Sequence, residues 1–115
     1  MVKVYGIKTC DSVRKALKFF KESNINVDFI DIRKEIPSKN MIKSWCDKTD
    51  INLVFNSRGT KYRTLKLKEL HLDENGKFNW LCKEPLLIKR PVIEYDSNVL
   101  VGFDEERYKK LFLPN

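Results

Sequence analysis

The fold is indicated most clearly by residues 2–32, which read VKVYGIKTCDSVRKALKFFKESNINVDFIDI. Val2, Lys3 and Val4 alternate between apolar and polar, which predicts a short strand that ends in a turn at the following glycine. Residues 27–32 are apolar except for two aspartates, and they predict a second strand. With a helix between them, these strands predict a right-handed parallel β-α-β crossover.

The connecting helix is predicted over residues 11–23. Val13, Ala16, Leu17 and Phe20 recur at the spacing i, i+3, i+4 and i+7, which places apolar side chains on one face of a helix. The other face carries lysines, an arginine and a glutamate. We therefore expect an amphipathic helix that buries its apolar face.

A helical insert is predicted at about residues 37–86. Ser38 has the side chain of a helix N-cap, and the helix that it begins should end near Thr49. Its expected buried stripe consists of Met41, Ile42, Trp45 and Cys46. Beyond it we expect a loop over 55–60, a short helical stretch over 61–72, a turn at Asn75-Gly76, and a helix with Phe78, Leu81 and Cys82 that stops before Pro85.

The end of the chain predicts a hairpin and a helix. Residues 91–95 and 99–101 are strand-like and are separated by Asp96-Ser97-Asn98. Asp104 is expected to cap a last helix that carries Tyr108, Leu111 and Phe112 on one side. The element order is β-α-β, helical insert, β-β-α, which indicates an α/β fold.

The composition favours one domain over residues 1–115. Two separate cores would leave fewer than about 60 residues to each. The chain is 42% apolar, which excludes the disordered class, and no apolar run exceeds three residues. Since a membrane span needs about 20 apolar residues and a signal peptide about 7 to 15, we expect neither.

The cysteines and the net charge indicate the cellular compartment and the class of partners. Cys10, Cys46 and Cys82 are widely spaced and cannot all pair within the chain, which favours a reducing cytoplasm. The net charge of +7 favours anionic partners, among them oxyanions, glutathione, acidic proteins and nucleic acid. The alternative is that the lysines only solvate the outer faces of helices.

Cys10 is the strongest candidate for chemistry. It lies between the first strand and the first helix, where backbone N–H groups converge and stabilise a thiolate. A helix terminus contributes only about 0.3 to 1 kcal/mol, so activation requires a nearby cation. Arg58 and Arg90 lie in predicted non-helical segments and are the candidates, while the alternative for Cys10 is a small buried core residue.

Four motifs in this chain resemble the arsenate reductase/Spx family, and most of all its small YffB-like members. They are YGIKTCDSVRKA at residues 5–16, NSRGT at 56–60, IKRP at 88–91 and VGF at 101–103. They occur in the same order as in the family and cover nearly the whole chain. The resemblance implies a thioredoxin-like fold with a mixed four-stranded sheet and a helical insert.

The resemblance also implies a site and a reaction. Its residues are the nucleophile Cys10, the oxyanion- and substrate-binding residues Arg58, Arg90 and Ser12, and the supporting residues Thr9 and Pro91, with a cis bond before the proline. Cys10 would attack a small oxyanion or a mixed disulfide, and glutathione, glutaredoxin or thioredoxin would resolve the adduct. Glutathione is thus a co-substrate, and no bound cofactor or metal is expected.

Two departures from the family pattern bear on the activity. The third arginine of arsenate-reducing members is absent, because the matching stretch reads Gly102-Phe103-Asp104, and Arg107 lies farther on. Val13 stands where oxidant-sensing members have a second cysteine. The alternatives to an enzyme are an Spx-like regulator that binds RNA polymerase, and a glutathione- or oxyanion-binding protein with little turnover.

The other chemistry-bearing residues are expected to be structural. Cys46 and Cys82 fall on apolar helix stripes, and His71 is the only histidine, so no metal set is expected. Tyr5, Trp45 and Trp80 lie among apolar neighbours, which favours the core over a base-stacking surface. We expect no direct binding of nucleic acid and no binding to a membrane, and a monomer is the default expectation for the oligomeric state.

Overall fold

The computed structural model describes residues 1–114, which divide into two compact units. The sheet unit comprises residues 1–31 and the chain from Arg90 onward, and the helical unit comprises Ile32–Lys89. The helical elements of the second unit begin at Lys39 and end at Leu87, close to the predicted insert. That both units act as one domain stays a prediction.

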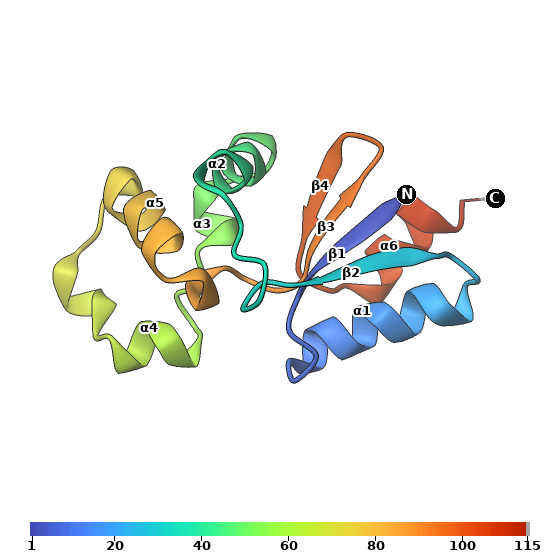
Figure 1. The fold of residues 1–115 in the computed structure, drawn as a ribbon, viewed down its shortest axis with the longest axis horizontal. Coiled ribbons are helices and arrows are strands. Elements are labelled where there is room, and N and C mark those ends of the chain that lie inside the picture. Colours follow the sequence, from blue (N-terminus) through green and yellow to red (C-terminus); the bar gives the residue numbers. More distant parts are fainter. Residues whose placement is uncertain (115) are drawn as a thin grey trace. The chain divides into compact units, whose positions relative to one another are not determined.

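The sheet unit contains a mixed sheet with two helices. Its elements are β1 (Val2–Gly6), α1 (Asp11–Glu22), β2 (Val27–Asp31), β3 (Val92–Tyr95), β4 (Asn98–Val101) and α6 (Glu105–Phe112). Within residues 1–114 the sheet has four strands in the order β2-β1-β3-β4 (Figure 1). β1 pairs in parallel with β2, and the other two pairings are antiparallel. The predicted thioredoxin-like α/β fold is confirmed.

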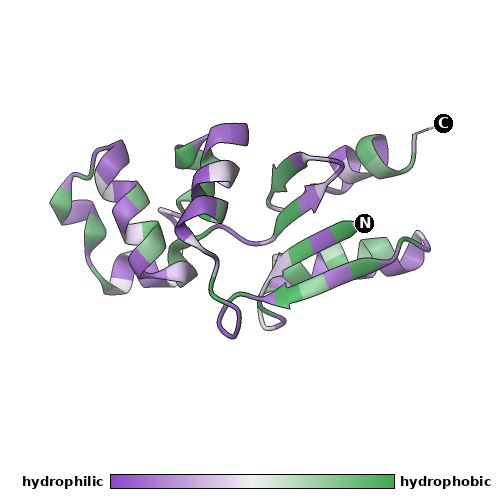
Figure 2. Ribbon diagram, turned by 45° about the horizontal axis from the view of Figure 1, so that its top comes forward, coloured by the Kyte–Doolittle hydropathy of each residue, from purple (hydrophilic) through white to green (hydrophobic). Residues whose placement is uncertain are grey.

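The core of the sheet unit lies between one face of the sheet and both helices. Val4 pairs with Ile93, and Ile93 pairs with Leu100, so these side chains form a row on the same face. Phe20 of α1 and Tyr108 of α6 pack against this row and are fully buried. The alternation of hydrophobic and hydrophilic residues along these elements is visible in Figure 2.

The hairpin between β3 and β4 has a two-residue turn. Asp96 and Ser97 have φ angles of 46° and 65°, the left-handed backbone that suits tight hairpins. β4 therefore begins at Asn98, one residue before the predicted start of the strand. The predicted capping of α6 is also confirmed, because the Asp104 carboxylate accepts a hydrogen bond of 3.2 Å from the Arg107 N–H.

The helical unit consists of short helices around a separate core. They are α2 (Lys39–Lys48), α3 (Ile51–Val54), α4 (Thr60–Thr64), the 3₁₀ helix η1 (Leu67–Leu70), α5 (Glu74–Lys83) and the 3₁₀ helix η2 (Pro85–Leu87). Ser38 caps α2 as predicted and accepts a hydrogen bond of 3.1 Å from the Met41 N–H. Ile42, Trp45, Val54 and Leu81 are fully buried.

Two expectations for the helical unit are corrected, and one helix is added. Asn75-Gly76 does not form a turn but lies in the first turn of α5, because the Asp73 carboxylate accepts from the Gly76 N–H at 2.8 Å and caps the helix. α3 has no counterpart in the prediction. Cys46 and Cys82 are half-buried rather than in the core, since the buried positions of their helices are Ile42 and Trp45 in α2 and Leu81 in α5.

None of the described helices has the length and apolar character needed to cross a membrane.

Candidate functional site

Cys10 lies at the junction of β1 and α1, where the sequence predicts a nucleophile. It is the N-cap of α1, with extended backbone angles of φ −84° and ψ 127°. Its N–H donates to the Ile7 carbonyl at 3.1 Å, and its carbonyl accepts from the Arg14 N–H at 3.0 Å. The backbone therefore holds Cys10 between a tight turn and the first turn of the helix.

The cap of α1 leaves the first-turn N–H groups available to sulfur. An N-cap side chain ordinarily accepts a hydrogen bond from the second or third helical N–H group. Cys10 makes no such bond to any part of the described chain, although it occupies the capping position and is half-buried. The first-turn N–H groups of α1 are therefore free of a bond to the Cys10 side chain.

A close contact between Gly6 and Val13 holds the start of α1 against the end of β1. A Cβ atom at residue 6 would lie 2.6 Å from Val13 Cγ2, so only glycine fits without displacement. Val13 is fully buried and belongs to the first turn of α1. Because Cys10 lies between these two residues in the chain, the contact also limits where its thiol can lie.

Pro91 directly precedes β3, at the end of the sheet where β1 leads to Cys10. Tyr5 pairs with Val92 in the antiparallel register of β1 and β3, so Pro91 lies beside Gly6. The Arg90–Pro91 bond is cis, as predicted. The Pro91 carbonyl accepts from the Gly102 N–H at 2.8 Å, while the missing proline N–H leaves no ladder bond unmade at the strand start.

The sheet unit contains five of the six predicted site residues. They are Thr9, Cys10, Ser12, Arg90 and Pro91, which lie on the segment that follows β1 and the segment that precedes β3. Ser12 and Arg90 are half-buried, and Thr9 is exposed. Because β1 and β3 are antiparallel, these two segments meet at one end of the sheet, whereas the individual functional roles stay predictions.

Arg58 belongs to the helical unit and lies in an ordered turn. Its N–H donates to Asn56 Oδ1 at 3.2 Å, and its carbonyl accepts from Arg63 Nη1 at 2.8 Å. The Arg58 side chain is exposed. Its part in the Cys10 site stays a prediction.

The stretch where the family's third arginine would stand is tied into the core of the sheet unit. Gly102 has a φ of 87°, which favours glycine, and its carbonyl accepts from the Tyr108 hydroxyl at 2.7 Å. Burial strongly raises the pKa of the Tyr108 hydroxyl, so it remains a hydrogen-bond donor across the ordinary pH range. Arg107 is exposed on α6.

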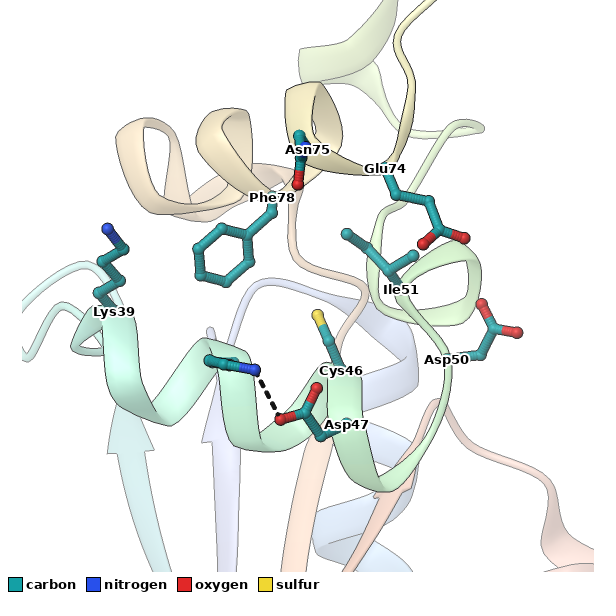
Figure 3. Close-up of a pocket in the computed structure, with 9 residues that line it drawn as sticks. Lys39, Cys46, Asp47, Asp50, Ile51, Glu74, Asn75 and Phe78 are labelled. Carbon is teal, nitrogen blue, oxygen red and sulfur yellow. Dashed lines mark hydrogen bonds and ion pairs between the residues drawn. The ribbon is translucent and has the colours of Figure 1, made fainter.

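The other two thiols lie in surroundings that disfavour a thiolate. Burial, followed by the nearby Asp47 carboxylate, raises the pKa of Cys46 to about 11. The Cys46 side chain points into a hollow of about 610 Å³ between α2 and the start of α5 (Figure 3). Burial also raises the pKa of Cys82. Neither residue therefore has the properties of an activated nucleophile.

Metal chemistry has no candidate site in residues 1–114. No three His, Cys, Asp or Glu side chains in this range are grouped so that they could hold an ion. His71 is exposed at the end of η1.

Comparisons with known proteins identify a matching family, an uncharacterized relative and a relative that is a transcriptional regulator. The family model for the ArsC family matches residues 5–111. An uncharacterized protein of Haemophilus influenzae is 35% identical over 113 residues, covering 97% of this chain and 99% of that protein. The global transcriptional regulator Spx 1 of Oceanobacillus iheyensis is 29% identical over 99% of this chain and 88% of its own.

Solved structures agree with this assignment. The YffB protein has a TM-score of 0.86 at 32% identity, covering 94% of this chain and 96% of its own. An arsenate reductase (ArsC) related protein from Brucella melitensis has a TM-score of 0.76 at 27% identity, covering 99% and 95%. The family model, the relatives and the shared fold together span the Cys10 and Arg90-Pro91 segments and nearly all the rest, and the chain therefore belongs to the ArsC family.

Proposed function

We propose that this protein is a glutathione-dependent thiol oxidoreductase with Cys10 as its nucleophile. The observation that supports this most is the position of Cys10 as the N-cap of α1. A thiolate there can accept hydrogen bonds from the first-turn N–H groups that a capping side chain ordinarily binds. The structure contains all three cysteines as free thiols, which is consistent with work in the reducing cytoplasm.

The reaction is the reduction of a glutathione-mixed disulfide. The Cys10 thiolate attacks the glutathione sulfur, a new S–S bond forms between Cys10 and glutathione, and the substrate leaves as a thiolate that takes a proton from water. A second glutathione thiolate then attacks the glutathione sulfur of this adduct. Oxidised glutathione leaves and the Cys10 thiolate is restored, so one substrate disulfide is reduced and one glutathione disulfide is formed.

In this proposal, two arginines and a hydroxyl group from the first turn of α1 bind the negatively charged groups of the substrate. Arg90 precedes β3 at the end of the sheet where β1 leads to Cys10, and its planar guanidinium suits carboxylate or oxyanion groups. Arg58 has the same role, and Ser12 contributes a hydroxyl group from the first turn of α1. The partners are thus a small anionic substrate or mixed disulfide together with glutathione, glutaredoxin or thioredoxin.

Arsenate should be a poorer substrate than a mixed disulfide. The stretch Gly102-Phe103 provides no third arginine, and Gly102 is held by Tyr108. Losing one preorganised donor to a developing oxyanion costs about 10² to 10³ in rate. Thiol–disulfide exchange develops little oxyanion charge, and it should lose less.

The test compares kcat/KM for a glutathione-mixed disulfide and for arsenate in the unmodified protein, Cys10→Ser and Cys82→Ser. Disulfide reduction should exceed arsenate reduction, Cys10→Ser should abolish both, and Cys82→Ser should retain both. Turnover that survives Cys10→Ser would refute the role of Cys10. Arsenate turnover as efficient as disulfide turnover would refute the argument from the missing arginine.

A second candidate function is that of a transcriptional regulator. It is favoured by the similarity to the Spx 1 regulator over 99% of this chain and by the net charge of +7. Such a regulator would bind an acidic surface of RNA polymerase without turnover. A pull-down with purified RNA polymerase tests it, and binding that Cys10→Ser leaves intact, in a protein without reductase activity, would favour regulation over catalysis.

A further inference from the structure

The helical unit has a hollow of about 330 Å³ that is distinct from the one at Cys46. It lies between the loop that carries Ser57 and the segment from η1 to the first turns of α5. Its volume is at the lower end of the range of small-molecule sites, about 300 to 1,000 Å³. The hollow is therefore large enough for a small organic molecule.

The polar side chains that line this hollow include two lysines, one histidine and one serine. Lys68, His71 and Lys77 contribute nitrogen-bearing side chains, and no described carboxylate lines it. In the hollow beside Cys46, by contrast, Lys39 shares the wall with Asp47 and other carboxylates (Figure 3). The two hollows belong to the same unit, so their difference in charge arises from these local side chains and not from the net charge of the chain.

One of the cations is held in place by neighbouring groups. Lys77 Nζ donates to Asn52 Oδ1 at 2.7 Å and lies 5.9 Å from the centroid of the Phe55 ring. Lys77 is also half-buried, so its side chain has lost part of its freedom before any ligand binds. This reduces the entropy cost of using it to bind an anion.

The remaining wall is apolar. The Phe55 and Tyr62 rings contact each other edge to face, with centroids 5.8 Å apart and planes at 85°. Leu67, which is 1% exposed, belongs to the same lining. An apolar wall with cations beside it suits a molecule that has a hydrophobic body and an anionic group.

Two residues at the ends of η1 have an unusual backbone conformation, and one of them, His71, lines the hollow. His71, at the end of η1, and Lys66, which precedes it, both have left-handed backbone with φ angles of 47° and 54°. Residues with a Cβ atom rarely adopt this conformation. At His71 this conformation goes together with a side chain that lines the hollow.

We propose that this hollow binds a small organic anion, with a carboxylate or phosphate group held by Lys68, His71 and Lys77 and an apolar body against Phe55 and Tyr62. All the residues that line the hollow belong to the helical unit, whereas Cys10 belongs to the sheet unit, so the proposal does not involve the thiol. Carboxylates and phosphates share the chemistry that the cations recognise, so the test uses one probe of each kind.

The first experiment is a titration of the full-length, ¹⁵N-labelled protein by NMR with phenyl phosphate, benzoate and uncharged benzyl alcohol. Phenyl phosphate or benzoate should shift the amide signals of Ser57, Leu67–Leu72 and Lys77 in a saturable way. Benzyl alcohol should bind at least about tenfold more weakly, because it lacks the charge-assisted hydrogen bonds. Equal binding of benzyl alcohol, or shifts spread over surface lysines without saturation, would overturn the proposal.

The second experiment uses a matched pair of lysines. Lys68→Met and Lys66→Met remove the same charge from neighbouring exposed positions, but only Lys68 lines the hollow. Lys68→Met should weaken binding of the preferred anion about tenfold, and Lys66→Met should change it less than about twofold. Equal weakening by both variants would show that the net charge, and not the hollow, attracts the anion.

Two further variants distinguish binding in the hollow from a change in folding and from chemistry at the thiol. His71→Gly removes the ring at a left-handed position that favours glycine, so it should weaken binding without lowering the midpoint of urea unfolding. Cys10→Ser should bind the anion as the unmodified protein does. Loss of binding in Cys10→Ser would contradict a separate site, whereas loss of reductase activity alone leaves this proposal standing and bears only on the proposed function.

Discussion

Replacing Gly6 with alanine tests how the helix that carries the nucleophile is held. The added Cβ would lie 2.6 Å from Val13 Cγ2, whereas ordinary van der Waals contact begins at 3.4 Å, so Val13 has to move by about 0.8 Å. Val13 is fully buried and β-branched, and it cannot rotate away freely. Overpacking of this kind costs about 1 to 3 kcal/mol. Gly6 does not have a positive φ, so backbone strain adds nothing to this cost.

The assay is urea unfolding of Gly6→Ala, Val13→Ala and the double variant. Val13→Ala alone should cost on the order of 2 kcal/mol, because it removes buried methyl groups and leaves a cavity. In the double variant the new methyl occupies that cavity, so the total loss should be at least about 1 kcal/mol smaller than the two single losses together. Additive losses, within about 0.5 kcal/mol, would refute the contact as the cause. Gly102→Ala is the control, since its φ of 87° makes the loss independent of residue 13.

Further predictions concern the thiols and two hydrogen bonds. Iodoacetamide at pH 8 should label Cys10 first, because a pKa of about 11 leaves only about 0.1% of Cys46 as thiolate; labelling of Cys46 or Cys82 at the rate of Cys10 would contradict this. The pKa of Cys46 is raised from 9.0 to about 11, so its thiol ionises more readily in the unfolded chain than in the folded protein. The free energy of unfolding should therefore be unaffected by this group below pH 9 and should fall as the pH rises from 9 toward 11. Cys46→Ala should reduce that fall in urea unfolding measured from pH 8 to 11. Tyr108→Phe should cost about 1 to 3 kcal/mol, measured by urea unfolding, because it leaves the buried Gly102 carbonyl without its 2.7 Å hydrogen bond; an unchanged midpoint would show that water replaces the hydroxyl. Asp104→Ala should cost about 0.5 to 2 kcal/mol through the lost cap of α6, and Asp104→Asn should recover most of it.

The elements of the sheet unit could be predicted because their sequence patterns are local. Val13, Ala16 and Phe20 follow the helical period, and these residues are all buried in the structure. The start of α5 was predicted wrongly, because Asn75-Gly76 resembles a turn when the Asp73 cap just before it is overlooked. Local propensity favoured the turn, and the capping carboxylate and the packing of Leu81 favoured the helix.

The features of the candidate site also differ in whether the local sequence could predict them. Cys10 could be identified from its place between a strand and a helix, since that junction is local. The apposition of Pro91 and Gly6 depends on the register of β1 and β3, and only the resemblance to the family indicated it. The cationic hollow gave no signal at all, because Lys68 and Lys77 belong to separate helices and come together only through the packing of the helical unit.

The capping position of Cys10 also affects the second half of an exchange reaction. In the mixed disulfide of the proposed reaction, the Cys10 sulfur would be uncharged and a poor acceptor for the first-turn N–H groups of α1, to which the Cys10 side chain makes no bond in this structure. When an incoming thiolate attacks the other sulfur, Cys10 departs as an anion, and those N–H groups stabilise it as a leaving group. If the proposed exchange reaction holds, the adduct would be the less stable form, and the supply of the second thiol would set how long the protein stays modified.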